Sequence, residues 1–317
     1  MPRAVIVALF LTLVVVLLVL AALFGLGWVL SSRVIVPVPY SLMPEFEILA
    51  VEPLEPIGGG AGPAPAGPAA APREALAVTL PVLEDPNQHA NTLVDGTYGL
   101  LWEGGYGLLG SQLSAAARAG GATAGDPSAD AATADVIRAV TVVEGAVPAA
   151  GTPARIDNFV YRRNPRADFG IDYEELALAG DQGSLRAWYV PGGGRTAVLL
   201  LHGRRRGELI ETLRMIQPLH ELGLDVLALA YRNHDESAAS SDGLYHYGAS
   251  EWRDAVVGAK LLAERGADRV ILFGLSMGGA VALEALERWS TELPEPIGVI
   301  LDSPLVDPYA TVELGAV

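Results

Sequence analysis

The sequence predicts an α/β fold for its C-terminal half, with a doubly wound and mostly parallel sheet, behind an N-terminal apolar helix and a small β-rich region. Three observations support this prediction. From Tyr173 onwards, short apolar runs alternate with helix-forming segments, a pattern typical of parallel sheets. The run Gly274–Gly278 reads Gly-Leu-Ser-Met-Gly and lies between an apolar strand-like run and a helix-like run. The segment Ala4–Leu30 is almost unbroken hydrocarbon.

The apolar segment Ala4–Leu30 is long enough to span a bilayer as one helix. It is longer than the hydrophobic region of a cleaved signal peptide, and no small-residue cleavage site follows it. Trp28 is suited to the membrane interface. We therefore expect residues 1–33 to be an uncleaved transmembrane signal anchor that crosses the cell membrane once. With Arg3 on the inner side, the rest of the chain is expected to be extracytoplasmic.

The bulk composition excludes several classes of function. A net charge of −16 argues against nucleic acid as a partner, and against attraction of the folded part to anionic membrane surfaces. The absence of cysteine excludes a disulfide, a thiolate metal site and a cysteine nucleophile. We expect no metal and no cofactor, and the sequence does not indicate an oligomeric state.

The chain after the anchor divides into three parts. Residues 34–76 are predicted to be an irregular Pro/Gly/Ala-rich linker, and the low-complexity run Gly58–Pro72 would hold the rest of the chain off the membrane. Residues 77–165 are predicted to be the small β-rich region. Residues 166–317 are predicted to be the α/β domain.

In the β-rich region, Thr97–Trp102 and Tyr106–Leu109 flank a Glu-Gly-Gly turn, which predicts a hairpin. Further strands are expected at Val136–Val143 and Arg155–Tyr161, because glycine and proline separate them. The Ala/Gly/Ser-rich stretch Ser114–Ala134 predicts a mobile loop.

The α/β part is predicted from apolar runs that alternate with helix-forming segments. Strands are predicted at Tyr173–Ala179, Leu185–Val190, Thr196–Leu201, Val226–Ala230, Arg269–Phe273 and Ile297–Leu301, and helices at Glu208–Leu222, Glu251–Arg265 and Gly279–Leu286. Ser250 is the expected N-cap of the second helix. Pro218 is expected to kink or break the first helix.

The Gly-Leu-Ser-Met-Gly run makes chemical sense as a tight turn from strand to helix. Such a turn forces Ser276 into a strained backbone conformation, and side chains at Gly274 and Gly278 would collide with neighbouring backbone. The hydroxyl of Ser276 would then project above the sheet edge, at a helix N-terminus that favours developing negative charge.

Four motifs occur in one order along the chain: Leu199–Gly203 (Leu-Leu-Leu-His-Gly), Tyr231–Ser237 (Tyr-Arg-Asn-His-Asp-Glu-Ser), Gly274–Gly279 (Gly-Leu-Ser-Met-Gly-Gly) and Leu301–Pro304 (Leu-Asp-Ser-Pro). Together they resemble the α/β-hydrolase superfamily, and bacterial serine hydrolases near the prolyl-oligopeptidase and acyl-esterase branches in particular. The resemblance covers the chain from about Tyr173 to its end.

The resemblance implies roles for individual residues. Ser276 matches the nucleophile, and the N–H of Met277 matches the first oxyanion donor. The loop after the His-Gly pair matches the turn that supplies the second donor, which assigns that role to the N–H of Arg204. The implied function is a membrane-anchored serine hydrolase that cleaves an ester, thioester or peptide bond of a small-molecule or peptide substrate through an acyl-serine. The implied fold is an α/β-hydrolase sheet that ends after the strand following the nucleophile helix.

The catalytic acid and base are harder to assign. No histidine follows Ser276, although the order in this fold is serine, acid, histidine. Asp302, or less favourably Asp307, is the candidate acid, against a structural role in capping the next turn.

Three explanations for the missing histidine stay open. The first is that the chain is part of a longer reading frame, because the sheet would lack its last strands, Ile297–Leu301 would be an exposed edge and Ala310–Val317 reads as the start of a helix. The second is a catalytically inactive, membrane-tethered binding or scaffold protein. The third is an unusual base, His202 or His234. On the first explanation, these 317 residues alone would be inactive.

Other candidates have plainer interpretations. His202 is interpreted as a strand-end residue that shapes its loop, and His234 as a surface loop residue. The run Arg204-Arg205-Arg206 is interpreted as a solvated charge cluster rather than an anion site, with Glu208 near enough in sequence to pair with one arginine. The sequence places no set of possible catalytic partners around the remaining histidines, His89, His220 and His246.

Overall fold

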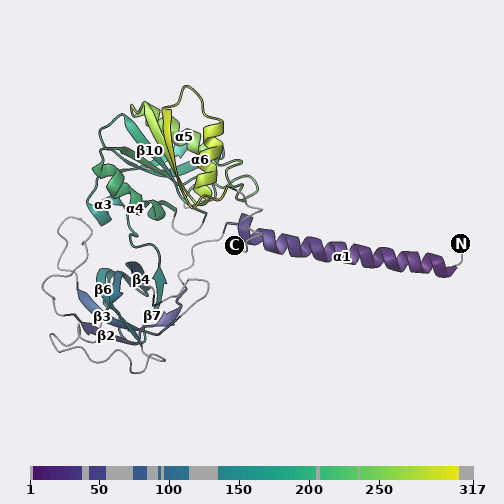
Figure 1. The fold of residues 1–317 in the computed structure, drawn as a ribbon, viewed down its shortest axis with the longest axis horizontal. Coiled ribbons are helices and arrows are strands. Elements are labelled where there is room, and N and C mark those ends of the chain that lie inside the picture. Colours follow the sequence, from purple (N-terminus) through teal and green to yellow (C-terminus); the bar gives the residue numbers. More distant parts are fainter. Residues whose placement is uncertain are drawn as a thin grey trace.

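The computed structural model describes residues 3–37, 43–54, 74–83, 92–93, 96–113, 135–204, 208–234 and 236–306. They form one long N-terminal helix and two separate sheets (Figure 1). Three predicted segments lie outside the described residues: the linker run Gly58–Pro72, the loop Ser114–Ala134 and the helix start Ala310–Val317.

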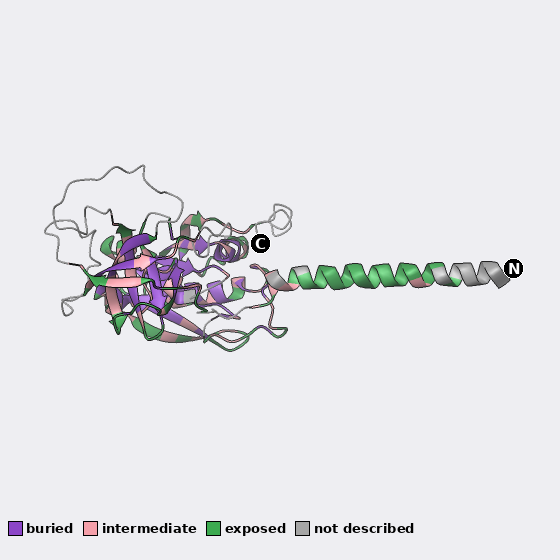
Figure 2. Ribbon diagram, turned by 90° about the horizontal axis from the view of Figure 1, so that it is seen from below, coloured by how far each residue is buried: buried purple, intermediate pink, exposed green. Residues whose placement is uncertain are grey.

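The N-terminal helix α1 spans Arg3–Ile35, two residues beyond the predicted end of the anchor. Its 33 residues give a length of about 50 Å at 1.5 Å per residue. Among the described residues, none of the apolar window Thr12–Val29 is buried, and Figure 2 shows the helix standing exposed beside the rest of the chain. The helix is long and apolar enough to cross a membrane, a property that a signal sequence near an N-terminus shares.

The first sheet has seven strands, all paired antiparallel, in the order β1-β7-β4-β5-β6-β3-β2. The strands are β1 (Phe46–Glu47), β2 (Ala50–Pro53), β3 (Ala75–Leu80), β4 (Tyr98–Trp102), β5 (Gly105–Gln112), β6 (Val136–Gly145) and β7 (Pro153–Asp157). The predicted hairpin is confirmed, because β4 and β5 pair from Tyr98↔Leu109 to Trp102↔Gly105. Two differences from the prediction stand out. Strands β1 and β2 lie where an irregular segment was expected, and β7 ends at Asp157 instead of continuing to Tyr161.

The second sheet has six strands in the order β13-β12-β10-β11-β9-β8. The strands are β8 (Glu174–Ala179), β9 (Ser184–Val190), β10 (Thr196–Leu201), β11 (Asp225–Leu229), β12 (Arg269–Leu275) and β13 (Glu295–Asp302). The block β11-β10-β12-β13 is parallel, whereas β9 and β8 run antiparallel at one side. The expectation of a mostly parallel sheet therefore needs correction. It fits this four-strand block, but over both sheets the pairings are mostly antiparallel, because no described helix lies between the strands of the first sheet to connect parallel neighbours.

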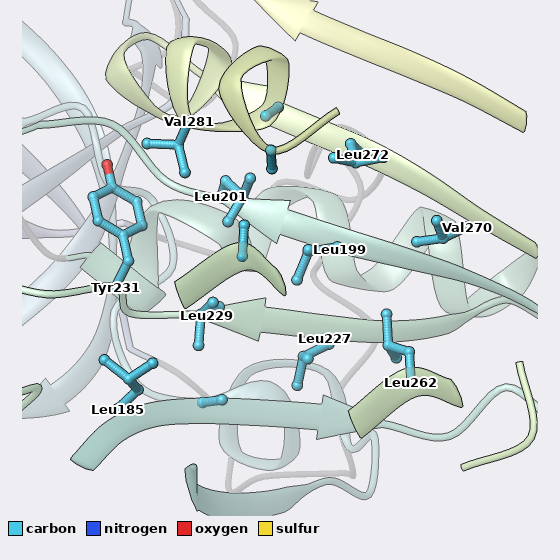
Figure 3. Close-up of a cluster of buried hydrophobic side chains, with 14 of the residues drawn as sticks. Leu185, Leu199, Leu201, Leu227, Leu229, Tyr231, Leu262, Val270, Leu272 and Val281 are labelled. Carbon is cyan, nitrogen blue, oxygen red and sulfur yellow. The ribbon is translucent and has the colours of Figure 1, made fainter. Parts of the chain in front are cut away.

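Helices cover both faces of the second sheet. α3 (Pro165–Phe169) and α4 (Glu208–Glu221) pack on one face, and α5 (Trp252–Glu264) and α6 (Met277–Glu287) pack on the other. Figure 3 shows the hydrophobic core between the second sheet and helices α5 and α6, to which Leu199, Leu227 and Val281 belong. Because β10 and β11 are covered on both faces, nearly every side chain on them is buried, which explains their continuous apolar sequence.

Two local predictions about the helices are resolved. Helix α5 begins after Glu251, with no side-chain cap, and the Ser250 hydroxyl instead lies 2.7 Å from Nδ1 of His246. The predicted Ser250 cap is therefore wrong, because this turn offers the hydroxyl a nearer partner. Helix α4 continues through Pro218 to Glu221 and ends before Gly223, which has a φ of 73°.

A buried ion pair fixes the loop that follows β11. The guanidinium of Arg232 donates to both oxygens of Asp254 on α5, at 2.8 and 2.6 Å, and to Asp181 at 2.6 Å. The backbone N–H of Arg232 donates to Asp254 as well. Both main partners are almost fully buried, so each charge depends on the other for compensation.

We predict that Asp254→Ala lowers the free energy of unfolding by about 3–5 kcal/mol, because it leaves the Arg232 charge buried without its main partner. Urea denaturation of the detergent-solubilised chain measures the effect. The matched control is Arg195→Ala, which breaks the solvent-exposed pair with Asp268. It should cost no more than about 1 kcal/mol. Equal losses for the two variants would contradict the prediction.

Candidate active site

The site lies where the carboxyl ends of three parallel strands meet. Leu201 at the end of β10 pairs with Gly274, and Leu275 at the end of β12 pairs with Asp302 of β13. Ser276 follows β12 directly and precedes α6. Its φ of 48° and ψ of −114° lie in a region that costs a non-glycine residue about 1–3 kcal/mol. The predicted strained turn is thus present at the predicted serine.

Hydrogen bonds on both sides hold the strained backbone of Ser276. Its N–H donates to the carbonyl of Asp302 at 2.9 Å, and its own carbonyl accepts from Gly279 and Leu305 at 3.0 Å. The end of β13 and the loop after it therefore fix this turn from outside. Among the described residues, no side chain forms a hydrogen bond with the hydroxyl of Ser276.

Two glycines make the turn possible. A Cβ at Gly274 would overlap the carbonyl oxygen of Gly278, and a Cβ at Gly278 would overlap the carbonyl oxygen of Leu201. Both clashes are with backbone atoms, which cannot move aside by changing rotamer as a side chain can. The prediction that side chains at these two positions would collide with neighbouring backbone is confirmed.

The N–H groups around Ser276 suit an anion. Met277 is the first residue of α6, and its N–H has no acceptor among the described residues. Across from it lies the Gly203–Arg204 loop, since a Cβ built on Gly203 would be 3.4 Å from Cβ of Ser276. The helix dipole adds positive potential at the Met277 side.

Sequence reasoning missed a carboxylate beside this loop. Glu211 of α4 accepts the N–H of Gly203 at 2.6 Å, so this N–H is committed to the fold. Both Glu211 oxygens and Cβ of Ser276 lie within 3.4 Å of the position that a Gly203 Cβ would take. The only signal in the sequence was an acid in the first turns of the helix that follows the loop.

Asp302 is brought to the same edge but is engaged elsewhere. Its carboxylate accepts from Arg214 of α4 at 3.0 Å and lies 3.2 Å from the hydroxyl of Ser303. No histidine among the described residues contacts it. In the described part of the chain its carboxylate is therefore held by α4, and its carbonyl holds the Ser276 turn.

Two histidines pack behind the Gly203–Arg204 loop in an aromatic cluster. The ring of His202 stacks on Tyr231 at 4.3 Å, and the ring of His234 stacks on Tyr245 at 4.6 Å. Burial, followed by the proximity of His234, lowers the pKa of His202 well below its usual value. Burial also lowers the pKa of His234 to about 4, against the opposing effect of hydrogen bonds to backbone carbonyls. His234 is buried, so its interpretation as a surface loop residue was wrong.

Neither histidine forms a hydrogen bond with Ser276. His202 places Nδ1 2.7 Å from the carbonyl of Gly203, and its Nε2 has no partner among the described residues. His234 places its two nitrogens 3.1 Å from the carbonyls of Arg232 and Arg204. Both rings therefore shape the loop, which is the role predicted for His202.

The remaining candidates do not join this site in the described structure. His246 pairs with Asp242 at 2.9 Å, and His220 lies in the last turn of α4. Four candidates lie outside the described residues: Arg205, Arg206, Asp307 and His89. The side chain of Glu208 also lies outside them.

Comparison with known proteins agrees with this geometry. Residues 198–316 match the model of the alpha/beta hydrolase family. This part of the chain is therefore similar to α/β hydrolases. The superfamily prediction made from the four motifs is confirmed at that level, and no curated relative matches the sequence.

Several solved structures are similar. An esterase from Pyrococcus furiosus is 26% identical, with a TM-score of 0.39 over 46% of this chain and 55% of that one. An esterase from Exiguobacterium antarcticum is 22% identical, with a TM-score of 0.35 over 41% and 46%. An α/β serine hydrolase without a lid from Xanthomonas campestris is 22% identical, with a TM-score of 0.34 over 45% and 78%. The chain thus spans little more than half the length of the Pyrococcus esterase.

We predict that Gly278→Ala lowers the free energy of unfolding by at least about 3 kcal/mol, because the added methyl group has only backbone to displace. Gly298→Ala is the matched control, since a Cβ there would meet nothing within 4 Å. Folded yield and melting temperature of the two variants measure the difference. Similar values for the two variants would show that a methyl group fits at position 278 and would contradict the prediction.

We predict that stability falls as the pH drops from about 6.5 towards 4, in part because of His234. Its folded-state pKa of about 4 lies below the ordinary 6.5, so the unfolded chain takes up the proton first. This contribution is fully present above pH 6.5 and is lost on acidification, by about 3 kcal/mol. Urea unfolding across this pH range should show a shallower slope for His234→Gln. Equal slopes would contradict the prediction.

Proposed function

We propose that this protein is a membrane-anchored serine hydrolase that cleaves an ester, thioester or peptide bond through an acyl-serine at Ser276. The observation that carries the proposal is the strained backbone of Ser276, held between β12 and α6 at a helix N-terminus. A protein retains such strain where it serves a function. The match of residues 198–316 to a hydrolase family model supports the same reading.

In this proposal each group at the site has a task. The hydroxyl oxygen of Ser276 attacks the substrate carbonyl carbon, and its proton passes to a base. The carbonyl oxygen becomes an oxyanion, which the N–H groups of Met277 and Arg204 would stabilise. Loss of one such donor costs about 2.7–4 kcal/mol in a related mechanism. The alcohol, thiol or amine then leaves with a proton, and water releases the acyl group from the serine.

Glu211 would act as a positioning residue in this scheme. By accepting the Gly203 N–H at 2.6 Å it fixes the loop that presents Arg204. The neutral histidine cluster supports the same loop from the other side through the Arg204 carbonyl. The loop would therefore be preorganised before substrate arrives, which is what makes an oxyanion site effective.

The proposed reaction also needs a catalytic base and a catalytic acid. A base must lie within hydrogen-bond reach of Ser276, and no histidine in the described part of the chain does. Asp302 remains the candidate acid by its position at the end of β13. The carboxylate of Asp302 also accepts from Arg214. To act as the catalytic acid, it would have to bind a histidine as well as Arg214.

The anchor completes the proposal. Helix α1 would span the membrane, with the sheets on the extracytoplasmic side. Protease added to intact spheroplasts should then release the sheet-containing part of the chain. Full protection of that part would reverse the orientation.

A second function is favoured by one observation. Because no described histidine reaches Ser276, the site is also consistent with a tethered binding or scaffold protein that keeps the turn without turnover. Such a protein would bind an acyl or carboxylate group at the same N–H groups. The two functions differ in whether the serine hydroxyl is activated.

We predict that Ser276→Ala abolishes fluorophosphonate labelling and short-chain p-nitrophenyl ester hydrolysis, with a loss of at least about 10⁴-fold. The melting temperature should stay nearly unchanged, because no described side chain binds the hydroxyl and its loss leaves little cavity.

The controls separate the two functions. A folded protein that neither labels nor hydrolyses would favour the binding protein. Fast labelling at Ser276 would show that a base is present, and His202→Gln and His234→Gln would test whether either histidine is that base.

A further inference from the structure

The end of the membrane anchor is attached to the rim of the candidate active site. The carbonyl of Val34, in the last turn of α1, accepts from the guanidinium of Arg204 at 2.6 Å and from the hydroxyl of Tyr247 at 2.7 Å. The carbonyl of Ile35 accepts from the N–H of Tyr245 at 2.8 Å. Helix ends leave such carbonyls without intrahelical partners. Here the hydrolase domain supplies the partners, although more than 160 residues separate them in sequence.

The attachment is electrostatic as well as geometric. The carboxyl end of a helix carries partial negative charge, which a cation close to it stabilises. Arg204 is that cation, and it belongs to the same loop that faces Ser276 through Gly203. A second route joins the same parts, because Tyr245 stacks on His234, and His234 contacts the Arg204 carbonyl.

The attachment also sets a height above the membrane. A window of α1 that is apolar enough to span a membrane ends at Val29, and Val34 follows five residues later. At 1.5 Å per residue this is about 8 Å along the helix. The headgroup region on each side of the hydrocarbon is about 5–8 Å thick. The Gly203–Arg204 loop therefore lies at the level of the lipid headgroups when α1 spans a bilayer. Figure 1 shows the end of α1 beside the second sheet and its helices.

We propose that the site at Ser276 opens onto the lipid surface and takes an amphiphilic ester whose hydrocarbon tail stays in the bilayer. This proposal rests on the proposed function, since it names the substrate class of the same site. The ester carbonyl of such an amphiphile lies at the boundary between headgroups and hydrocarbon, about 8 Å below the level at which α1 holds the loop. Such a substrate needs to rise by about that distance, while its tail remains solvated by lipid.

The height of the site is tested first, without reference to catalysis. The chain has no cysteine, so single cysteines can be labelled with bimane in the full chain in nanodiscs. Val306→Cys reports on the site, because Val306 is exposed and follows Leu305, whose N–H donates to Ser276. Leu222→Cys is the matched control, exposed at the end of α4 away from the strand ends that form the site. A headgroup-nitroxide lipid should quench the first label and leave the second bright.

The substrate class is tested with two fluorophosphonates that share one reactive group. One carries a hexadecyl chain and is dissolved in the bilayer, and the other is short and soluble. A twelve-residue Gly/Ser insertion between Ser31 and Ser32 would let the domain move away by roughly 20 Å. It should lower labelling by the hexadecyl probe about tenfold relative to the short probe, since the local concentration of bilayer-held probe falls. The same insertion after Gly60 should change neither rate.

Each outcome has one reading. Quenching at Val306→Cys that the Ser31/Ser32 insertion removes, with selective loss of hexadecyl labelling, supports the proposal. Absence of quenching at Val306→Cys overturns it, whatever the probes do. Equal effects of the insertion on both probes overturn the substrate class. Quenching without labelling of Ser276 by either probe refutes the proposed hydrolase activity while the membrane position stands.

Discussion

The structure of the candidate site depends on a close approach between the first turn of α6 and the end of β10. Gly278 lies so near the carbonyls of Leu201 and His202 that no side chain fits between them. This contact brings the helix N-terminus over the strand ends and forces Ser276 into its strained conformation. The hydrogen bonds to Asp302 and Leu305 then lock the turn from the side of β13. Strain of this kind persists only because the surroundings determine the backbone from several directions.

The loop facing that turn is stabilised in an unusual way for polar groups. One side is fixed by a carboxylate, Glu211, and the other by two histidines that burial keeps neutral. Keeping them neutral avoids placing buried positive charge beside the loop, and aromatic stacking replaces the lost hydration. The side chain of Arg204, which is the cation of this loop, instead binds the carbonyl of Val34 at the end of α1. The same short loop thus contacts the Ser276 turn, the sheet core and helix α1.

The sequence was most informative where one local pattern determines the structure. The Gly-Leu-Ser-Met-Gly run between an apolar strand and a helix identified the Ser276 turn, because backbone crowding leaves few residue types that fit. The apolar runs located β10, β11 and β12 correctly for the same reason. Contacts between distant segments were not predictable. Nothing local to Glu211, Asp302 or Val34 indicates that the first holds Gly203, the second binds Arg214 and the third binds Arg204. The burial of His234 was missed because its hydrophilic neighbours in sequence suggested a surface loop.

The position of His234 has one more consequence. Its two ring nitrogens face two carbonyl oxygens, those of Arg232 and Arg204, at the same distance. A neutral imidazole carries a single N–H, so it can donate to only one of them at a time. The two tautomers therefore fasten different segments: one holds the loop fixed by the Asp254 ion pair, and the other holds the loop that faces Ser276. The ring nitrogen that carries the proton therefore decides which of the two segments His234 binds.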